Sequence, residues 1–399
     1  MRLCDITLSY TETSGGIRTY IDAKRKFLRS ETEHDHVLII PGETDECASD
    51  GRNTTYTVAS PILPGCEPYR FFLRPDKIRD ALAESLPDVI ELGSFYVAPW
   101  AAFRHQRDRA EIGSRPLVSG YFHTDIAEAY VGGPLRNAFH GWSRAVEWVG
   151  DKLADAAERG AEAYVGSAFE QCDIRLAASE AQAGRLREYG VEEVRVLPLG
   201  VDLDVFSPEK RSEERAALLG VDDHTLVLIF TGRLDVEKQV HLLVDALEML
   251  PAGFDAALVL MGEGPLREEL EVRSKRDARL IVLPYESDRG RLARVLASAD
   301  IYVTAGPHET FGLSVVEAQA CGLPVVGVAG GALVERVPEG LGLLGPVGDA
   351  RAMADNILRV ADQRRAMGAR ARRHVETRFG WDTTCRKLLQ IYEQAFQDA

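Results

Sequence analysis

The chain has 399 residues, of which 45% are hydrophobic and 27% are charged, a balance typical of a globular protein. Its formal charge of −15 makes it a poor candidate for general nucleic-acid binding, which depends on many Lys and Arg contacts to phosphates. No apolar run approaches the roughly 18 residues of a membrane span, and the first residues lack a signal-peptide pattern. The six cysteines are scattered without a CxxC pair, so we expect reduced thiols in a cytoplasmic protein.

The first half of the chain alternates apolar runs with amphipathic stretches, which is the pattern of parallel α/β units. We predict a strand around Leu3–Leu8, then a loop and a helix from Ile17 to about Leu28. Further strands are predicted at Val37–Ile40, Val89–Leu92, Leu117–Phe122, Ala163–Val165, Arg175–Ala178 and Val194–Leu197. The segment 197–208 combines Pro and Gly punctuation with a shift in composition, and it predicts a domain boundary.

The second half restarts the same pattern. Strands are predicted at Leu226–Phe230, Ala257–Met261, Leu280–Leu283, Ile301–Thr304 and Pro324–Val328, with a helix over Gln239–Leu250. The last segment predicts an amphipathic helix from Trp381, with Asp382 as its N-cap. The chain is therefore predicted to form two Rossmann-like, doubly wound domains, residues 1–200 and 201–378, that face one another across a cleft.

The loop after the first strand of the second half carries two cations beside a predicted helix N-terminus. In the stretch 231–238, Arg233 and Lys238 follow the strand and precede the helix. Fixed cations and free backbone N–H groups at such a place form a diphosphate site. Taken alone, this loop is equally consistent with two solvated surface cations.

A second loop carries Glu309 before a helix that we expect to begin near Gly312 and to end at Gly322, with Glu317 on it. The two carboxylates are eight positions apart, about 12 Å if the span is helical. Because helix amides lie between them, one carboxylate can reach sugar hydroxyls and the other a ribose, while the amides face phosphates. A capping acid and a solvated helix acid are the structural alternative.

Glu309 and Glu317 reproduce the E-x7-E signature of family 4 glycosyltransferases, and the text around them also resembles that family. The similar stretches are GRLDVEK at 232–238, MGEGPL at 261–266, EAQACGLPVVG at 317–327, GG at 330–331 and LPLGVDLDVF at 197–206. In the first domain the resemblance depends on Ser14-Gly15-Gly16 and Phe122-His123-Thr124-Asp125. It implies the two-domain GT-B fold, with residues 379–399 forming a helix that crosses back to pack on the first domain.

The resemblance also implies roles for individual residues. Arg233 and Lys238 are expected to grip the donor diphosphate as it leaves, Glu309 to hydrogen-bond the donor sugar, and Glu317 to hydrogen-bond the ribose. The candidate catalytic residues are then Glu309, His123, Arg233 and Lys238. The remaining candidates that contact the donor are Gly16, Gly262, Phe311, Gly312 and Leu313, the last three through backbone amides.

The acceptor side is predicted to include Gly15, His123 and Asp125. Gly16, in the glycine loop beside Gly15, lets backbone amides approach phosphates because it has no side chain. His123 is expected near the reacting face of the sugar. From sequence alone, a satisfied histidine at a strand end is an equal alternative.

The implied activity is retaining transfer of a glucose- or mannose-type hexosyl group from a UDP- or GDP-sugar to an acceptor hydroxyl. No close pair of carboxylates flanks a sugar as in retaining glycosidases, so we favour front-face attack, with the departing phosphate oxygen taking the acceptor proton. The alternatives are a sugar-nucleotide epimerase, a non-catalytic nucleotide-sugar sensor, and a sucrose or trehalose synthase, which differs only in acceptor.

Two short motifs could suggest metal binding. Asp202-Leu203-Asp204 has the form of a metal–nucleotide motif, but it lies in the interdomain segment, so we interpret it as structural. His34-Asp35-His36 precedes a strand and has no evident third ligand. We therefore predict no metal and no cofactor, the nucleotide sugar being a substrate.

The first helix suggests that this acidic protein has a basic surface that could bind a membrane. It carries Arg18, Lys24, Arg25, Lys26 and Arg29 against Asp22, a local excess of +4. The segment 68–74 adds aromatic and basic residues together. Such a surface can dock on anionic lipid, so we expect peripheral contact with the inner face of the membrane. A membrane lipid or glycan is then a candidate acceptor. The alternative, which we place slightly ahead, is a basic face that is simply solvated.

Overall fold

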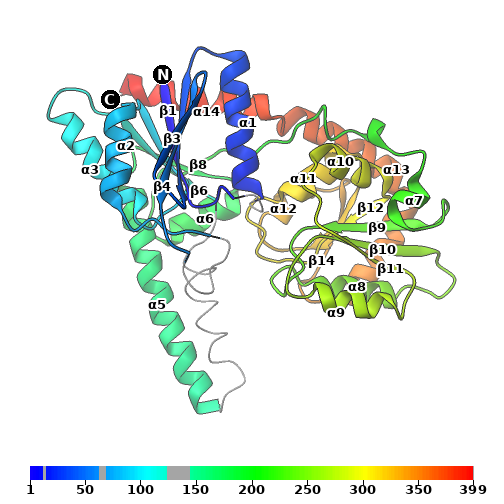
Figure 1. Cartoon of the computed structure of the whole chain (residues 1–399). Coiled ribbons are helices and arrows are strands. Elements are labelled where there is room, and N and C mark those ends of the chain that lie inside the picture. Colours follow the sequence, from blue (N-terminus) through cyan, green and yellow to red (C-terminus); the bar gives the residue numbers. More distant parts are fainter. Residues whose placement is uncertain (12–14, 63–68, 124–143, 399) are drawn as a thin grey trace. The chain divides into compact units, whose positions relative to one another are not determined.

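The computed structural model describes residues 1–11, 15–62, 69–123 and 144–398, and the chain divides into two compact units. Unit 1 comprises Met1–Pro198 with Cys385–Ala399, and unit 2 comprises Leu199–Thr384. Each unit is an α/β fold built on its own mostly parallel sheet (Figure 1). The predicted class of two doubly wound α/β domains is confirmed.

Unit 1 contains an eight-stranded sheet in the order β3-β4-β2-β1-β5-β6-β7-β8. Its strands are β1 (Arg2–Ile6), β2 (Asp35–Gly42), β3 (Glu46–Asp50), β4 (Asn53–Ala59), β5 (Val89–Leu92), β6 (Leu117–Phe122), β7 (Ile174–Ala177) and β8 (Arg195–Val196). All neighbours pair in parallel except β3 and β4, which form an antiparallel edge. The central strand β1 lies between β2 and β5, so the carboxyl ends of these three parallel strands lie side by side in the middle of the sheet.

The two faces of this sheet differ because side chains alternate along each strand. On one face Cys4, Ile6 and Leu92 pack in an apolar core with α2 (Pro75–Ser85), α3 (Ala98–Ala110), the end of α5 (Arg144–Glu170) and α6 (Glu180–Glu188). On the other face Asp5 and Glu91 meet α1 (Gly16–Glu31) and α14 (Trp381–Asp398) through polar contacts. One face is therefore an ordinary core, and the other holds buried charge.

Unit 2 contains a six-stranded, fully parallel sheet in the order β11-β10-β9-β12-β13-β14. The strands are β9 (Leu226–Thr231), β10 (Ala256–Met261), β11 (Leu280–Leu283), β12 (Ile301–Val303), β13 (Val325–Val328) and β14 (Gly342–Gly345). The helices are α7 (Arg215–Leu219), α8 (Val240–Glu248), α9 (Arg267–Ser274), α10 (Arg289–Ser298), α11 (Leu313–Ala320), α12 (Leu333–Arg336) and α13 (Ala350–Arg378). The strand order reverses between β9 and β12, and ligands of such sheets bind at that point.

Three predictions of secondary structure were wrong or incomplete. The expected strand Ala163–Val165 lies inside helix α5, because a three-residue apolar run does not distinguish a strand from a buried helical turn. The β3–β4 edge was missed because its residues are polar and mostly exposed or half-buried. Strand β14 was missed because two of its four residues are glycine.

The C-terminal helix α14 is amphipathic, as its spacing predicted. Cys385, Leu388, Leu389 and Tyr392 are buried, and this part of the helix belongs to unit 1. Asp382 lies in the first turn of α14 and not at the N-cap, since the helix begins at Trp381. The helix therefore contributes its apolar stripe to the N-terminal unit.

Candidate functional site

Close backbone packing of two loops builds the sheet edge in unit 2. A side chain at Gly262, after β10, would collide with the carbonyl oxygen of Gly232, after β9. The loops are also hydrogen-bonded, because Leu234 N–H donates to Glu263 O at 2.9 Å and Leu266 N–H donates to Leu234 O at 3.0 Å. Gly262 is thus required for the shape of the site before any ligand is considered.

Three predicted residues meet at the carboxylate of Glu309. Lys238 Nζ lies 3.1 Å from Glu309 Oε2, and Gly312 N–H donates to Glu309 Oε1 at 3.1 Å. Burial opposes the charge on Lys238, but the attraction of Glu309 and Glu237 outweighs it, and the pKa of Lys238 is raised. Lys238 is therefore a fixed cation held beside the N-terminus of α11.

Asp235 organises the cationic loop, although sequence reasoning passed over it. Its carboxylate accepts a hydrogen bond from Lys238 N–H at 2.9 Å, and it lies 3.0 Å from Arg233 Nε. The Arg233 side chain is 70% exposed, so it is tethered at one nitrogen and open to a ligand elsewhere. The signal available in the sequence was an acid within the turn, three positions before Lys238.

A double glycine and a buried arginine support the loop of Glu309. A side chain at Gly331 would lie 2.6 Å from Glu309 O, and Ala332 N–H donates to that oxygen at 2.8 Å. Arg336 is buried, donates to Phe311 O at 2.9 Å, and places its guanidinium 4.4 Å from the centre of the Phe311 ring. Arg336 had no local signal, because its partners come from a distant part of the chain.

Glu317 occupies a separate, more enclosed environment. It is 3% exposed and paired with Arg289, whose guanidinium lies 4.7 Å from the centre of the Phe206 ring. Burial raises the pKa of Glu317, and Arg289 opposes that effect. Glu309 precedes α11 while Glu317 lies on it, so the span between them is only partly helical and the predicted axial separation does not apply.

The two metal-like motifs are engaged within the fold. Asp202 Oδ1 accepts from the backbone N–H groups of Asp204 and Val205, at 3.2 and 3.1 Å. His34 Nδ1 lies 3.0 Å from the N-terminal nitrogen, while His36 faces Asp5. Within the described ranges, no three His, Cys, Asp or Glu residues are grouped as metal ligands.

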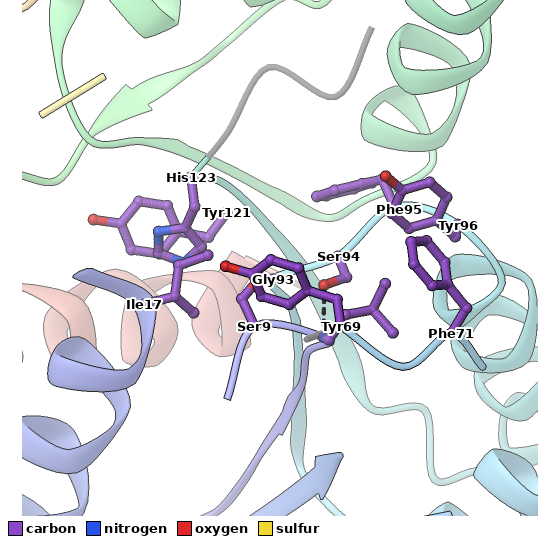
Figure 2. Close-up of a pocket in the computed structure, with 11 residues that line it drawn as sticks. Ser9, Ile17, Tyr69, Phe71, Gly93, Ser94, Phe95, Tyr96, Tyr121 and His123 are labelled. Atoms are coloured by element: carbon purple, nitrogen blue, oxygen red, sulfur yellow. Dashed lines mark hydrogen bonds between the residues drawn. The ribbon is translucent and has the colours of Figure 1, made fainter. Parts of the chain in front are cut away.

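Unit 1 has a small aromatic pocket at the carboxyl ends of β1, β5 and β6 (Figure 2). Its free space is about 30 Å³, which is enough to admit a small polar group such as a hydroxyl. Ser94 Oγ accepts from Leu8 N–H at 2.9 Å beside it. The lining residues are Leu8, Ser9, Ile17, Tyr69, Phe71, Gly93, Ser94, Phe95, Tyr96, Tyr121 and His123.

His123 follows β6 and forms one wall of this pocket. Its ring lies 4.0 Å from the Tyr121 ring and 5.5 Å from the Tyr20 ring, measured between centroids. Burial, with a further contribution from the charge of Lys24, lowers the pKa of His123 to about 3. The imidazole is therefore neutral near pH 7.

The glycine loop reaches the same pocket. Gly15 is exposed and directly precedes α1, Gly16 is the first residue of that helix, and Ile17 lines the pocket. The first turn of α1 has no acidic residue and no side-chain cap. Asp125, the other residue predicted on the acceptor side, lies outside the described residues.

Part of the basic face expected on the first helix is buried inside unit 1. Lys24 is 2% exposed between Asp5 and Glu91, and Arg25 donates to His36 and Thr55. The side chains of Tyr69 and Phe71 line the pocket, so part of the segment 68–74 turns inward. The expectation was wrong for Lys24, because helical spacing does not reveal which cation finds a buried partner, whereas Lys26 and Arg29 are exposed.

In the ranges that the structure covers, no helix is both long enough and apolar enough to cross a bilayer.

Two α/β units, each built on its own mostly parallel sheet, are the architecture of the GT-B fold. Solved structures with this fold include sucrose-phosphate synthase from Thermosynechococcus elongatus, with a TM-score of 0.77, 20% identity and complete coverage of both chains. They also include Anabaena HepE in complex with UDP and glucose, with a TM-score of 0.72, 18% identity, and coverage of 99% of this chain and 100% of that one.

Sequence comparison gives the family. Models for "Glycosyltransferase Family 4" and "Glycosyl transferases group 1" match residues 14–205 and 225–363. A GDP-mannose-dependent alpha-(1-6)-phosphatidylinositol dimannoside mannosyltransferase of Mycobacterium tuberculosis is 30% identical over 364 residues, 89% of this chain and 84% of that protein. A D-inositol 3-phosphate glycosyltransferase of Xylanimonas cellulosilytica is 37% identical over 246 residues, 55% of this chain and 58% of that protein. The chain belongs to glycosyltransferase family 4, as its motifs indicated.

Proposed function

We propose that this glycosyltransferase moves a glucose- or mannose-type hexosyl group from a UDP- or GDP-sugar to an acceptor hydroxyl, with retention of configuration. The single observation that carries the proposal is the Glu309 carboxylate held between Lys238 Nζ and the Gly312 N–H. A cation, a carboxylate and helix amides are the groups that a sugar diphosphate requires. Membership in the family supports the same assignment.

The donor diphosphate binds to the cations of unit 2. Lys238 carries three N–H groups, and one of them faces Glu309, so others remain for phosphate oxygens. Arg233 adds a second, more exposed cation, and Glu309 also serves the sugar hydroxyls. Glu317, with Arg289 beside it, takes the ribose.

The chemical step is departure of the nucleoside diphosphate. Negative charge develops on the leaving phosphate, and Lys238, Arg233 and the amides of Gly312 and Leu313 stabilise it. One preorganised donor of this kind contributes roughly 3–4 kcal/mol to the transition state. The acceptor hydroxyl attacks the anomeric carbon from the face that the phosphate leaves, and this retains the configuration. The departing phosphate oxygen takes the proton of the acceptor hydroxyl.

The acceptor hydroxyl enters the aromatic pocket of unit 1, where His123, Ser94 and the end of α1 surround a hydroxyl-sized space. Tyr69 and Tyr96 offer ring faces to a saccharide or a cyclic polyol outside that space. The relatives named above take their names from inositol-containing molecules, which supports an acceptor that is such a ring, free or attached to a membrane lipid.

The donor is identified by a thermal-shift screen of the pure protein with UDP-glucose, UDP-galactose, UDP-N-acetylglucosamine and GDP-mannose. One of these is expected to raise the Tm of the wild type and of Lys275→Ala, an exposed lysine of the same unit, and not that of Lys238→Ala. Stabilisation without turnover would favour the sensor, and interconversion of the sugar without transfer would favour the epimerase. No stabilisation by any of them would refute the donor site.

The acceptor is sought with D-inositol 3-phosphate and with vesicles that contain phosphatidylinositol, each supplied with the donor found above. His123→Ala is expected to raise the KM of the acceptor while the KM of the donor changes little. Because we expect no metal requirement, EDTA should leave the rate unchanged, and loss of turnover with EDTA would overturn that expectation.

A further inference from the structure

A sealed network of ionisable side chains lies on the α1/α14 face of the unit 1 sheet. Lys24 of α1 donates to Asp5 Oδ1 of β1 at 2.7 Å and to Glu91 Oε1 of β5 at 3.0 Å. These three side chains are at most 5% exposed. Because buried charges are costly unless they are paired and hydrogen-bonded, such a network needs every partner it has.

The Asp5 end of the network has a fixed direction of hydrogen bonding. Arg25 Nε donates to His36 Nδ1 at 3.0 Å, so that nitrogen carries no proton. The proton of the neutral imidazole is then on Nε2, which donates to Asp5 Oδ2 at 2.5 Å. Asp5 thus accepts from His36 and from Lys24, and both bonds favour its ionised form.

The Glu91 end is completed by the C-terminal helix. Tyr20 of α1 donates to Glu91 Oε2 at 3.1 Å, and the hydroxyl of Tyr392, from α14, also donates to that oxygen. One cation serves two carboxylates, and Asp5 is the better supplied, so Glu91 is the carboxylate that holds a proton most readily. Burial raises the pKa of Glu91 to about 7, while Lys24 and Tyr392 pull it downward.

The network also touches the wall of the aromatic pocket. Lys24 Nζ lies 4.4 Å from the centre of the Tyr20 ring, and the Tyr20 ring lies 5.5 Å from that of His123. Tyr121 packs edge-on against Tyr20 at 5.3 Å and contacts His123 at 4.0 Å, which completes the support. The hydroxyl of Tyr20, whose ring packs near His123, therefore donates to Glu91, and Glu91 also accepts a hydrogen bond from Tyr392 of α14.

We propose that Tyr392 is a positioning residue for the acceptor pocket: it holds Glu91, Glu91 holds Tyr20, and Tyr20 with Tyr121 holds the His123 ring. That the pocket binds an acceptor depends on the proposed function, whereas the chain of contacts from Tyr392 through Glu91 and Tyr20 to His123 does not. The groups that face Glu91 are Asp5 from β1, Tyr20 and Lys24 from α1, and Tyr392 from α14. Protonation of Glu91 changes what Tyr20 can donate to, so the His123 ring senses it.

The test follows the ring nitrogens of His123 by NMR of the full chain labelled with 15N-histidine, with His123→Gln as the assignment control. Because the His123 imidazole stays neutral near pH 7, any change in its signals across this range reports a neighbour. We expect the His123 signals to shift with a midpoint near the pKa of Glu91, about 7. Glu91→Gln should abolish that midpoint.

The matched pair of variants is Tyr392→Phe and Tyr189→Phe, each of which removes one hydroxyl and keeps the ring. Losing the hydrogen bond from Tyr392 should raise the midpoint by about 0.5 to 1 on the pH scale, as expected for one bond to a carboxylate. Tyr189, half-buried against Phe122, should leave it unchanged. A flat His123 signal in the wild type, or an equal midpoint in Tyr392→Phe and Tyr189→Phe, would overturn the proposal.

The same variants separate this proposal from the proposed function. If the chain transfers sugar, Tyr392→Phe should raise the KM of the acceptor at least twofold without changing that of the donor. If no donor binds, the proposed function fails, while the His123 titration still decides the link. A change in acceptor KM in Tyr189→Phe as large as in Tyr392→Phe would count against positioning by Tyr392.

Discussion

Each unit contains a lysine paired with a glutamate at nearly the same distance, and we expect the two pairs to have different roles. Lys24 Nζ lies 3.0 Å from Glu91 in unit 1, and Lys238 Nζ lies 3.1 Å from Glu309 in unit 2. The first pair is 2% and 4% exposed, and the second is 21% and 19% exposed. The two Lys–Glu distances are nearly equal, so the pairs differ in the residues and the solvent that surround them.

The surroundings decide which pair can accept a ligand. Lys24 has three oxygen partners within hydrogen-bonding distance, Asp5, Tyr20 and Glu91, so all three of its N–H groups are used. Lys238 stands at the open ends of parallel strands beside helix amides, where an anion is favoured. A saturated, sealed lysine stabilises the fold, and an unsaturated one at a sheet edge is available for binding.

The largest effect is expected from removing α14. Truncation after Arg378 removes Leu388, Leu389 and Tyr392 from unit 1 and exposes the surface that they cover. At about 2 kcal/mol for each large buried side chain, the loss is on the order of 5 kcal/mol or more. Thermal unfolding should show the Tm fall by roughly 10 °C or more. An unchanged Tm would refute the packing role of this helix.

The sealed lysine should be nearly as sensitive. Lys24→Met leaves two buried carboxylates without their cation, which costs about 3–5 kcal/mol. Lys26→Met, at an exposed position on the same helix, should change stability by no more than about 0.5 kcal/mol. Urea unfolding compares the two variants directly. Equal stability of the two would mean that Lys24 does not balance the charge of the network.

The open lysine should matter little for stability. Lys238→Met breaks a pair that remains partly solvated, so its cost should stay within about 1 kcal/mol. The same substitution should lower turnover by roughly 10²- to 10³-fold if Lys238 stabilises the leaving diphosphate. Urea unfolding beside a transfer assay checks both parts. A loss of stability as large as that of Lys24→Met would erase the contrast between the pairs.

The smallest effect is a difference in pH dependence. The folded pKa of Glu91, about 7, is above its ordinary value, so its contribution to stability is full at low pH and is lost as the pH rises through 7. Glu91→Gln has no such dependence. The Tm advantage of the wild type over Glu91→Gln should therefore shrink by a few degrees between about pH 5 and about pH 8. An advantage that grows over this range would contradict the raised pKa.

The sequence predicted the candidate site of unit 2 better than that of unit 1, for physical reasons. Strand β9, the loop with Lys238 and the loop with Glu309 follow local patterns of apolar runs, glycines and caps, and these were recognised. Two of the three partners of Lys24, Asp5 and Glu91, come from β1 and β5, which are distant from it in the sequence. No periodicity indicates such a meeting, so a buried cation was interpreted as part of a basic surface.

The same limit applies within the site. Glu309 and Lys238 were predicted to serve one ligand, but their direct pairing depends on how β9 and β12 lie side by side in the sheet. The support from Arg336 depends on a contact with Phe311 that spans 25 positions. The places of the short motifs in the fold were predictable, and the distant residues that support them were not.

The most direct test of the contrast is calorimetric titration of UDP and GDP into the wild type, Lys238→Met and Lys275→Met. One of the nucleotides should bind the wild type and Lys275→Met alike, and should bind Lys238→Met at least about tenfold more weakly, the loss expected when one charged hydrogen bond is removed. Equal affinity for all three proteins would remove Lys238 from the donor site and contradict the division between a sealed and a ligand-binding lysine.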